Sequence, residues 1–313
     1  MYCKALNKSF DDKNKLFKEL KANEEKLIFT KKSCKYESFE RGQYAFSQLI
    51  KNKDFAQKSN FDFEDGYYYP VINTTRYYDS HEDVHFDGLW KKTIKDQTGK
   101  IAYVSNHKTD IDNIIVWPEN VKVFTQLIDW AMVGKDYLGQ TEALIFKIAE
   151  ADIQKENVIK AFKEKRNIQG SISMMYYKIT MAIDSNLEEY KANKAYYDSR
   201  INLIANKEIP QDKGYFFGVD EARIFGEGSL VYRGSNDATE IIYPKSNIAI
   251  CPHCKYDFDY LSIKESGMGY VKCPNCDGIV TQENVKSEPL QSTQKTIKEP
   301  SYEDTLKYLV QNY

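Results

Sequence analysis

Residues 170–183 read GSISMMYYKITMAI, and this stretch decides the fold class. Its β-branched and aromatic side chains are typical of a long β-strand. The segment before it, ADIQKENVIKAFKEKR at 151–166, places apolar side chains at helical spacing and predicts a helix. A helix that leads into a long strand indicates a mixed fold.

The remaining sequence extends this mixed pattern. Apolar and charged residues alternate at helical spacing in 10–33, which predicts one amphipathic helix or two short ones, with Asp11 and Asp12 as plausible caps. A further helix is expected at about 186–206. The β-rich runs joined by short turns are YYYPVINTTRYY, KIAYVSNH, NIIVW, VKVFTQLIDWAMVG, TEALIFKIAE, GYFFGVDEARI and GEGSLVYRGS.

These patterns divide the chain into four parts. We expect an N-terminal helical extension at 1–66 and a strand-rich α+β main domain at 67–245. A cysteine-bearing module follows at 246–283. Residues 284–313 form a polar linker and a short terminal helix, SYEDTLKYLVQNY.

The composition excludes several classes of protein. Of 313 residues, 44 are Lys or Arg and 46 are Asp or Glu, so the net charge is -2. No basic field draws such a chain to nucleic acid, and we expect no nucleic-acid partner. The start lacks the apolar run of a signal peptide, and no apolar stretch is long enough to span a bilayer. We therefore expect a soluble intracellular protein with no membrane partner.

Four of the six cysteines form a metal-binding pattern. Cys251-Pro-His-Cys254 and Cys273-Pro-Asn-Cys276 are two C-x-x-C turns separated by residues 255–272. Two such turns supply the four thiolates of a tetrahedral zinc shell, so this spacing predicts a structural zinc ribbon. Zinc binding contributes on the order of 10–16 kcal/mol in small zinc peptides, which supplies the stability that a short module lacks. His253 is expected to be an exposed turn residue, because four thiolates already complete the shell.

The pentapeptide HEDVH, residues 81–85, matches the H-E-x-x-H pattern of zinc metallopeptidases. That chemistry needs His81 and His85 on one face of a helix, with Glu82 as the general base. The flanking Tyr, Val, Asp and Gly residues favour a turn and strands instead. His107 is a conceivable third ligand, but no known metallopeptidase continuation follows. A metallopeptidase is thus the less favoured reading of this segment.

Three other places carry residues suited to nucleophilic catalysis. His107 ends a strand in KIAYVSNHKTDI, Ser171 opens the strand at 170–183, and Glu227 lies in a Gly-flanked turn in ARIFGEGSLVYRGSN. Taken singly, each has an ordinary structural explanation: a loop histidine, a strand serine and a solvated carboxylate. Their significance comes from the order in which they follow one another along the chain.

The order of these motifs resembles the prohead, or capsid maturation, proteases of tailed bacteriophages, which are distant relatives of the herpesvirus assemblins. The matching order is D-x-H-x-D before Gly-Leu-Trp, a strand ending in Asn-His, a Ser-Ile-x-Met strand after a helix, and E-x-S-L-V followed by G-S-N. The resemblance covers about 67–239. It implies that His107 is the general base, Ser171 the nucleophile and Glu227 the third member.

This chain departs from the family motif at two positions. Ser173 replaces its Gly, and Met174 replaces its aromatic residue. Strand alternation puts Ser171 and Ser173 on the same face, so periodicity leaves both open as the nucleophile. The resemblance favours Ser171. Arg200 and Arg223 are candidates for binding the oxyanion.

The resemblance also implies a fold, a location and partners. The fold would be a barrel-like protease domain with flanking helices, to which the zinc ribbon is added. The activity would be endoproteolysis of the major capsid protein, of the scaffold and of the chain itself, inside the procapsid that assembles in the host cytoplasm. A homo-oligomer is a further expectation. The competing hypothesis is a catalytically silent scaffold or docking protein.

Overall fold

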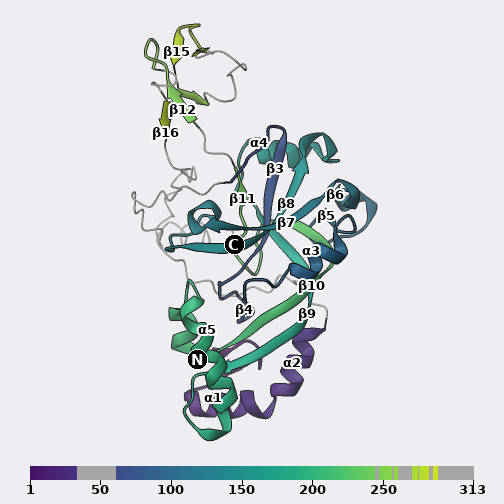
Figure 1. Ribbon diagram of the computed structural model, residues 1–313, viewed down its shortest axis with the longest axis vertical. Coiled ribbons are helices and arrows are strands. Elements are labelled where there is room, and N and C mark those ends of the chain that lie inside the picture. Colours follow the sequence, from purple (N-terminus) through teal and green to yellow (C-terminus); the bar gives the residue numbers. More distant parts are fainter. Residues whose placement is uncertain are drawn as a thin grey trace, which may run out of the picture. The chain divides into compact units, whose positions relative to one another are not determined.

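The computed structural model describes residues 1–33, 61–243, 247–255, 257–259, 270–273, 275–281 and 285–287. The stretch quoted at the start lies in strand β9, Gln169–Ile183, as its sequence predicts. β9 pairs along its length with the antiparallel strand β10, Tyr215–Val231. Figure 1 shows the pair as two long arrows that run from the other strands to a group of helices.

β10 joins two runs that the sequence predicts separately, at 214–224 and 226–235. The pairs Ile224–Met174 and Gly228–Ile172 enclose more residues on β10 than on β9, which defines a bulge. Gly226 lies inside the bulge with a φ of 80°, a left-handed conformation that glycine adopts without steric cost. The strand therefore continues through its Gly-rich segment instead of ending there.

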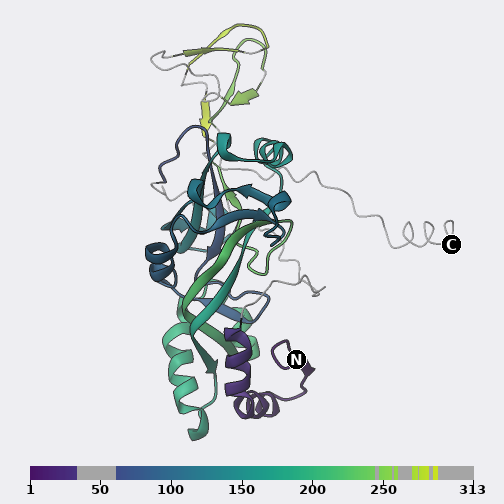
Figure 2. The same cartoon turned by 90° about the vertical axis from the view of Figure 1, so that its right-hand side faces the viewer.

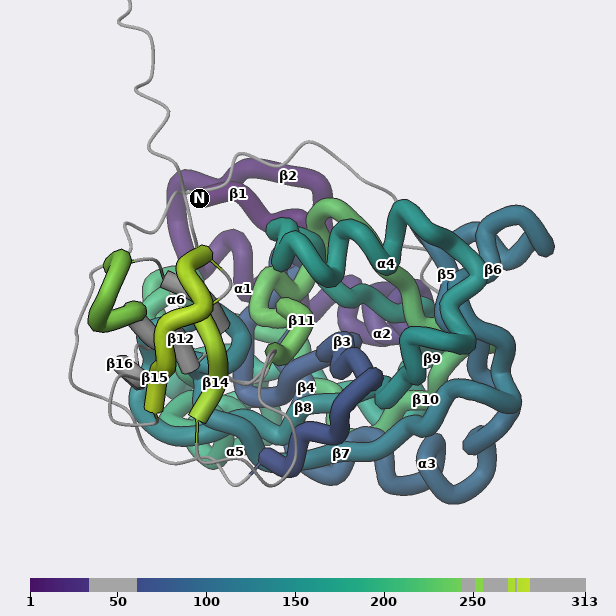
Figure 3. Tube along the Cα trace, turned by 90° about the horizontal axis from the view of Figure 1, so that it is seen from above, coloured from purple at the N-terminus to yellow at the C-terminus, as the bar shows by residue number. Residues whose placement is uncertain are grey.

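Two sheets form the body of this part of the chain. In the first, β9 lies on one side of β10, and β4, Asp83–His85, and β5, Ala102–Ser105, lie parallel to β10 on the other. β6, Ile114–Val116, completes this sheet. The second sheet has the order β11–β3–β8–β7, which Figure 3 shows from above. Its strands are β3, Tyr67–Thr74; β7, Lys122–Asp129; β8, Gln140–Ala149; and β11, Ile241–Ile242.

Both sheets contribute to one hydrophobic core. Phe146 of β8, Tyr103 of β5 and Ile172 of β9 are buried in the same cluster. An isolated bridge between Gln169 and Glu240 also joins the two sheets at one edge.

The barrel-like arrangement that the resemblance implies is not a closed barrel. In the described residues, β6 and β7 lie at the ends of their sheets and pair with no further strand. A barrel needs continuous pairing around its whole circumference, and this edge breaks it. The strand-rich α+β class is confirmed, as two packed and open sheets.

Helices form in the stretches where the sequence predicts helical spacing: α1, Lys13–Ala22; α2, Glu24–Lys32; α4, Glu156–Lys163; and α5, Lys191–Arg200. Two shorter helices are α3, Lys91–Gln97, and α6, Glu208–Lys213, and α6 lies beyond the stretch predicted at 186–206. None of these helices is long and apolar enough to cross a membrane.

The N-terminal residues pack into the same body as the sheets. Asp12 caps α1 by accepting hydrogen bonds from the backbone N–H groups of Asn14 and Lys15. Leu16 and Leu20 of α1 are fully buried in the shared core. Figure 2 shows the purple N-terminal helices and the teal-green helix α5 on opposite sides of the lower half of β9 and β10. A short hairpin of β1, Tyr2–Cys3, and β2, Lys8–Ser9, precedes α1.

The chain clusters into two compact units, Met1–Tyr243 and Pro244–Tyr313. In the second unit, β12 pairs with β13 and β16, and β14 pairs with β15. The bounds are Asn247–Ile250, Asp257–Asp259, Tyr270–Lys272, Ile279–Thr281 and Val285–Ser287 for β12 to β16. The terminal helix expected at 301–313 lies outside the described residues, and so does Cys34, which is not part of the metal-binding pattern.

We predict that α1 is a stability element of the first unit. Leu16→Ala should lower the free energy of unfolding by about 2–5 kcal/mol, because it leaves a cavity in a fully buried position. Phe29→Ala is the control, since this side chain is 76% exposed and should change stability by no more than about 0.5 kcal/mol. Urea unfolding of the full chain measures both. Equal midpoints for the two variants would mean that α1 is not integral to the core.

Candidate active site

His107 stands between the other two predicted site residues. Its Nε2 lies 3.0 Å from Ser171 Oγ, and its Nδ1 lies 2.8 Å from Glu227 Oε1. The His107 side chain is 11% exposed and that of Glu227 is 2% exposed. Ser171 is also buried. Ser171 and Glu227 lie 64 and 120 residues after His107 in the sequence, on the paired strands β9 and β10. Both therefore meet at the His107 imidazole.

A tight turn after β5 presents His107. Asn106 and His107 both have positive φ values, 52° and 58°, which side-chain-bearing residues adopt rarely. Two hydrogen bonds to β10 hold this turn: His107 N–H donates to Ser229 Oγ at 2.8 Å, and Asn106 N–H donates to the Leu230 carbonyl at 3.0 Å. The backbone strain is thus fixed by the strand that also carries Glu227.

The bulge in β10 aims Glu227 at His107. Glu227 lies in the same irregular region as Gly226, and it pairs with Ala102 of β5. Gly228 follows, and a Cβ there would lie 2.5 Å from the Phe146 ring. The Gly-Glu-Gly sequence is therefore needed on both sides: one glycine for the bulge and one for close packing. Among the described residues, the second oxygen of Glu227 has no hydrogen-bond partner.

Ser171 is positioned by a close backbone approach at Gly170. A Cβ on Gly170 would lie 1.9 Å from the Val71 carbonyl oxygen, so no larger residue fits. Gly170 N–H donates to the Thr239 carbonyl at 2.7 Å, and Thr239 Oγ1 donates to the Gly170 carbonyl at 2.6 Å. These contacts fix the backbone immediately before the serine.

The segment after β10 also lies over Ser171. Gly234 N–H donates to Gln169 Oε1 at 2.8 Å, and a Cβ on Gly234 would lie 3.8 Å from Ser171 Cβ. Asn236 anchors the segment to β3 through the backbone carbonyl and hydroxyl of Thr74. The Gly-Ser-Asn run of the sequence motif is thus placed beside the serine.

A small cavity adjoins Ser171. It measures about 10 Å³, roughly the space of one water molecule. Its lining comprises Ile72, Asn73, His85, Gly170, Ser171, Ile172, Met174, Ser235 and Asn236. A larger depression of about 610 Å³ lies elsewhere, beside Tyr67 and Ile159, and contains none of the three site residues.

The geometry distinguishes Ser171 from Ser173. Ser173 Oγ lies 3.3 Å from Nδ1 of His107, the nitrogen that also meets Glu227. Ser171 Oγ meets the opposite nitrogen, Nε2. When Nδ1–H donates to a carboxylate, Nε2 is the basic nitrogen, so the arrangement favours Ser171 as the residue that loses a proton.

HEDVH does not form a metallopeptidase face. His81 lies in a turn, and Asp83–His85 is strand β4, so the two histidines do not share a helix. Glu82 accepts hydrogen bonds from the backbone N–H groups of Lys4 and Ala5, and His85 Nε2 meets the hydroxyl of Tyr176.

The two arginines proposed for the oxyanion have other partners. Arg200 pairs with Asp220 at 2.8 Å, and Arg223 pairs with Asp96 at 3.0 Å. None of the contacts described for either arginine reaches Ser171. Sequence reasoning also missed Gln169, Ser229 and Thr239 as positioning residues. Of these three residues, only Ser229 could have been identified from the sequence, because it is the serine of the E-x-S-L-V motif.

The four predicted cysteine ligands form a separate cluster in the second unit. The sulfur atoms of Cys251, Cys254, Cys273 and Cys276 all lie within 4.8 Å of one another. Each turn closes with a residue of positive φ, Lys255 at 62° and Asp277 at 56°. His253 is exposed, as expected. The cluster is compatible with a four-thiolate metal site.

Comparisons of the chain with protein-family models, with curated proteins and with solved structures found no match.

Proposed function

We propose that the chain is a serine hydrolase that cleaves peptide bonds. The observation that carries the proposal is the His107 ring, which touches Ser171 through Nε2 and Glu227 through Nδ1. A serine hydroxyl is a poor nucleophile until a neighbouring base removes its proton. A carboxylate on the other ring nitrogen selects the required tautomer and stabilises the imidazolium that forms.

The proposed reaction has two halves. His107 Nε2 takes the hydroxyl proton as Ser171 Oγ attacks the peptide carbonyl carbon, and the imidazolium then gives that proton to the leaving amine. Water next attacks the Ser171 ester, again losing a proton to Nε2, and the serine recovers its proton as the new carboxylic acid departs.

Within that class, we propose a prohead maturation protease. The support is the order of the motifs over 67–239 together with the meeting of their His, Ser and Glu residues. The substrates would be the capsid and scaffold proteins and the chain itself, inside the procapsid in the host cytoplasm. A catalytically silent scaffold is the second candidate, and it is favoured by the burial of Ser171, which is 4% exposed.

We also propose that the four cysteines hold a structural Zn²⁺. Four thiolates in a closed shell suit zinc and leave no open position for substrate. Cys251 and Cys273 are fully buried beside Val271 and Val280 in a very small apolar cluster. Such a cluster is too small to stabilise a fold, so the metal would supply the missing stability.

Ser171 should react with a fluorophosphonate, a probe that phosphonylates activated serines. Intact mass should show one adduct on the wild type and none on Ser171→Ala. Ser173→Ala is the matched control and should still react, because its hydroxyl lies on the other side of the imidazole. The same three proteins, incubated with the major capsid protein of the same genome, should show cleavage in the same pattern. Labelling that survives in Ser171→Ala would reject this nucleophile.

Glu227→Gln should keep the fold and lose most of the activity. The amide is nearly the same size but can stabilise the wrong imidazole tautomer, and such a change costs about 10⁴-fold in kcat in a well-studied serine protease. The rate of fluorophosphonate labelling measures the loss. Asp237→Asn, an exposed carboxylate change, is the control. A rate close to that of the wild type in Glu227→Gln would remove Glu227 from the proposed triad.

One zinc ion per chain is expected from elemental analysis of the purified protein. Cys273→Ser should abolish stoichiometric zinc, because it removes one of four clustered thiolates. Cys3→Ser should retain it, since Cys3 belongs to the first unit. Full zinc content in Cys273→Ser would contradict the four-cysteine site.

A further inference from the structure

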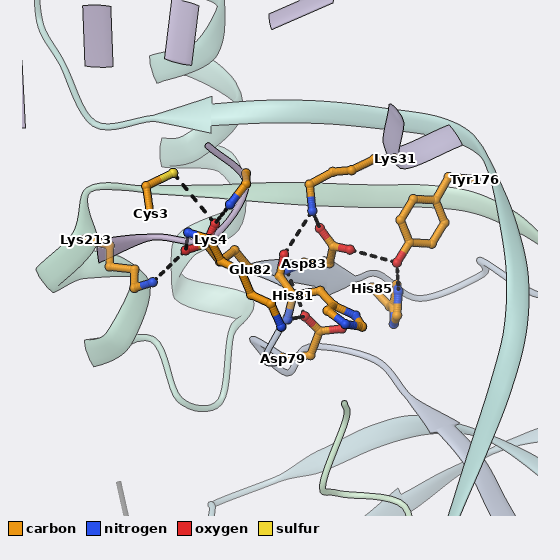
Figure 4. Close-up of polar contacts among 11 residues, drawn as sticks. Cys3, Lys4, Lys31, Asp79, His81, Glu82, Asp83, His85, Tyr176 and Lys213 are labelled. Atoms are coloured by element: carbon orange, nitrogen blue, oxygen red, sulfur yellow. Dashed lines mark hydrogen bonds and ion pairs between the residues drawn. The ribbon is translucent and has the colours of Figure 1, made fainter. Parts of the chain in front are cut away.

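Two adjacent carboxylates of the HEDVH segment are buried and point to different partners. Glu82 is 2% exposed and accepts hydrogen bonds from the backbone of Lys4 and Ala5 at 3.0 Å, and from Lys213 Nζ at 2.7 Å. Asp83 is fully buried and pairs with Lys31 of α2. Figure 4 shows the two groups, with Lys213 and Lys31 on separate carboxylates.

From Asp83, a chain of hydrogen bonds runs through the interior. Tyr176 Oη donates to Asp83 Oδ2 at 2.9 Å and lies 3.2 Å from His85 Nε2, as Figure 4 shows. His85 Nδ1 lies 3.0 Å from Asn73 Nδ2, and Trp90 Nε1 donates to Asn73 Oδ1 at 3.3 Å. The chain thus links α2, β4, β9 and β3.

The donor inventory fixes the direction of this chain. An indole N–H can only donate, so Asn73 presents its oxygen to Trp90 and its NH₂ group to His85. His85 Nδ1 must then accept, and the proton of the neutral ring is on Nε2. This Nε2–H donates to Tyr176, whose own proton goes to Asp83. A protonated His85 would set Nδ1–H against the NH₂ group of Asn73.

His85 also reaches the candidate active site. Its side chain lines the small cavity that adjoins Ser171. Tyr176 and Ser171 belong to the same strand, β9. Tyr176 of β9 contacts His85 directly, and Asp83 of β4 and Lys31 of α2 lie behind it. The other residues that line the cavity are uncharged. His107 contacts the hydroxyl group of Ser171.

We propose that Lys31 of α2, by compensating the charge of Asp83, keeps His85 neutral in the Nε2–H form that Asn73 selects, and thereby sets the polarity of the cavity beside Ser171. Lys31, Asp83 and Tyr176 are positioning residues that act through His85. The consequence for catalysis rests on the proposed function of Ser171. The protonation state of His85 does not depend on that proposed function, and it can be tested separately.

Imidazole NMR of the full chain tests the tautomer. The sequence has 4 histidines, so His85 can be assigned with His85→Gln. In the wild type, its Nε2–H signal should persist and the ring should stay neutral as the pH falls through about 6.5, where a free imidazole gains its proton. Lys31→Met leaves the Asp83 charge uncompensated, which favours a cationic ring, so His85 should titrate near or above that pH. Identical His85 behaviour in Lys31→Met and wild type would overturn the proposal.

Matched variants distinguish an effect of the Lys31–Asp83–Tyr176–His85 contacts from a general loss of stability. Lys213→Met removes the lysine of the neighbouring carboxylate, Glu82, and should leave His85 unchanged. Lys31→Arg keeps the cation and should restore the behaviour of the wild type. If Lys31→Met does not fold, Tyr176→Phe removes one hydroxyl and should abolish the protected Nε2–H signal. Its control is Tyr103→Phe, because the buried Tyr103 hydroxyl has no hydrogen-bond partner within the described part of the chain.

The rate of Ser171 labelling tests the coupling to the site. Lys31→Met should slow labelling roughly tenfold or more, as small displacements near a reacting group do, whereas Lys213→Met should not. A changed His85 with an unchanged labelling rate would overturn the coupling. Absence of labelling in the wild type would count against the proposed function alone. The methyl signal of Met174, which lines the same cavity, would then report the coupling: a shift in Lys31→Met supports it and no shift overturns it.

Discussion

The antiparallel ladder between β9 and β10 is the constraint on which the candidate site depends. It sets Ser171 opposite Ser229, and Ser229 in turn holds the backbone of His107. The bulge then places Glu227 two residues before Ser229 and beside the same ring. Strand register is fixed over many residue pairs. A slip of one residue would turn Ser171 to the other face of the sheet and break its contact with His107.

Buried charge is the second constraint, and it binds the N-terminal residues to the sheets. Asp83 and Glu82 are almost inaccessible, so each needs a cation or several hydrogen bonds. Lys31 and the backbone of Lys4 and Ala5 supply them from the first thirty-odd residues of the chain. A buried pair of this kind adds little net stability but strongly penalises the loss of one partner. It therefore specifies where the N-terminal segment docks more than it stabilises the fold.

The sequence predicted elements well and their partners poorly. The long strand at 170–183, the helices at 10–33 and the Asp12 cap follow from local periodicity and capping chemistry. The continuity of β10 could not be predicted in this way, because a Glu between two glycines is typical of a turn. Pairing with β9 on both sides of Glu227 extends the strand through this segment. Strand period alone could not choose between Ser171 and Ser173, since both face His107; only the identity of the ring nitrogen separates them.

The polar contacts of HEDVH were beyond sequence reasoning for a related reason. The side chains of Glu82, Asp83 and His85 bind groups from distant elements, such as α6, α2 and β9, and no local pattern encodes these contacts. The histidines of the pentapeptide match the metallopeptidase pattern, but it is the buried carboxylates of Glu82 and Asp83 that bind the N-terminal segment. A motif of three fixed letters records residue types without their backbone conformation, and a strand directs the same letters differently from a helix.

The two interior histidines show how neighbours set the chemistry of one residue type. His107 faces a carboxylate through Nδ1, an acceptor that can stabilise a positive ring while Nε2 exchanges a proton with a serine. His85 faces an amide NH₂ group through Nδ1, a donor that disfavours a protonated ring. The first environment suits a residue that changes charge, and the second suits one that does not. Both rings adjoin Ser171, so the proposed proton transfer and the fixed dipole of His85 lie at the same serine.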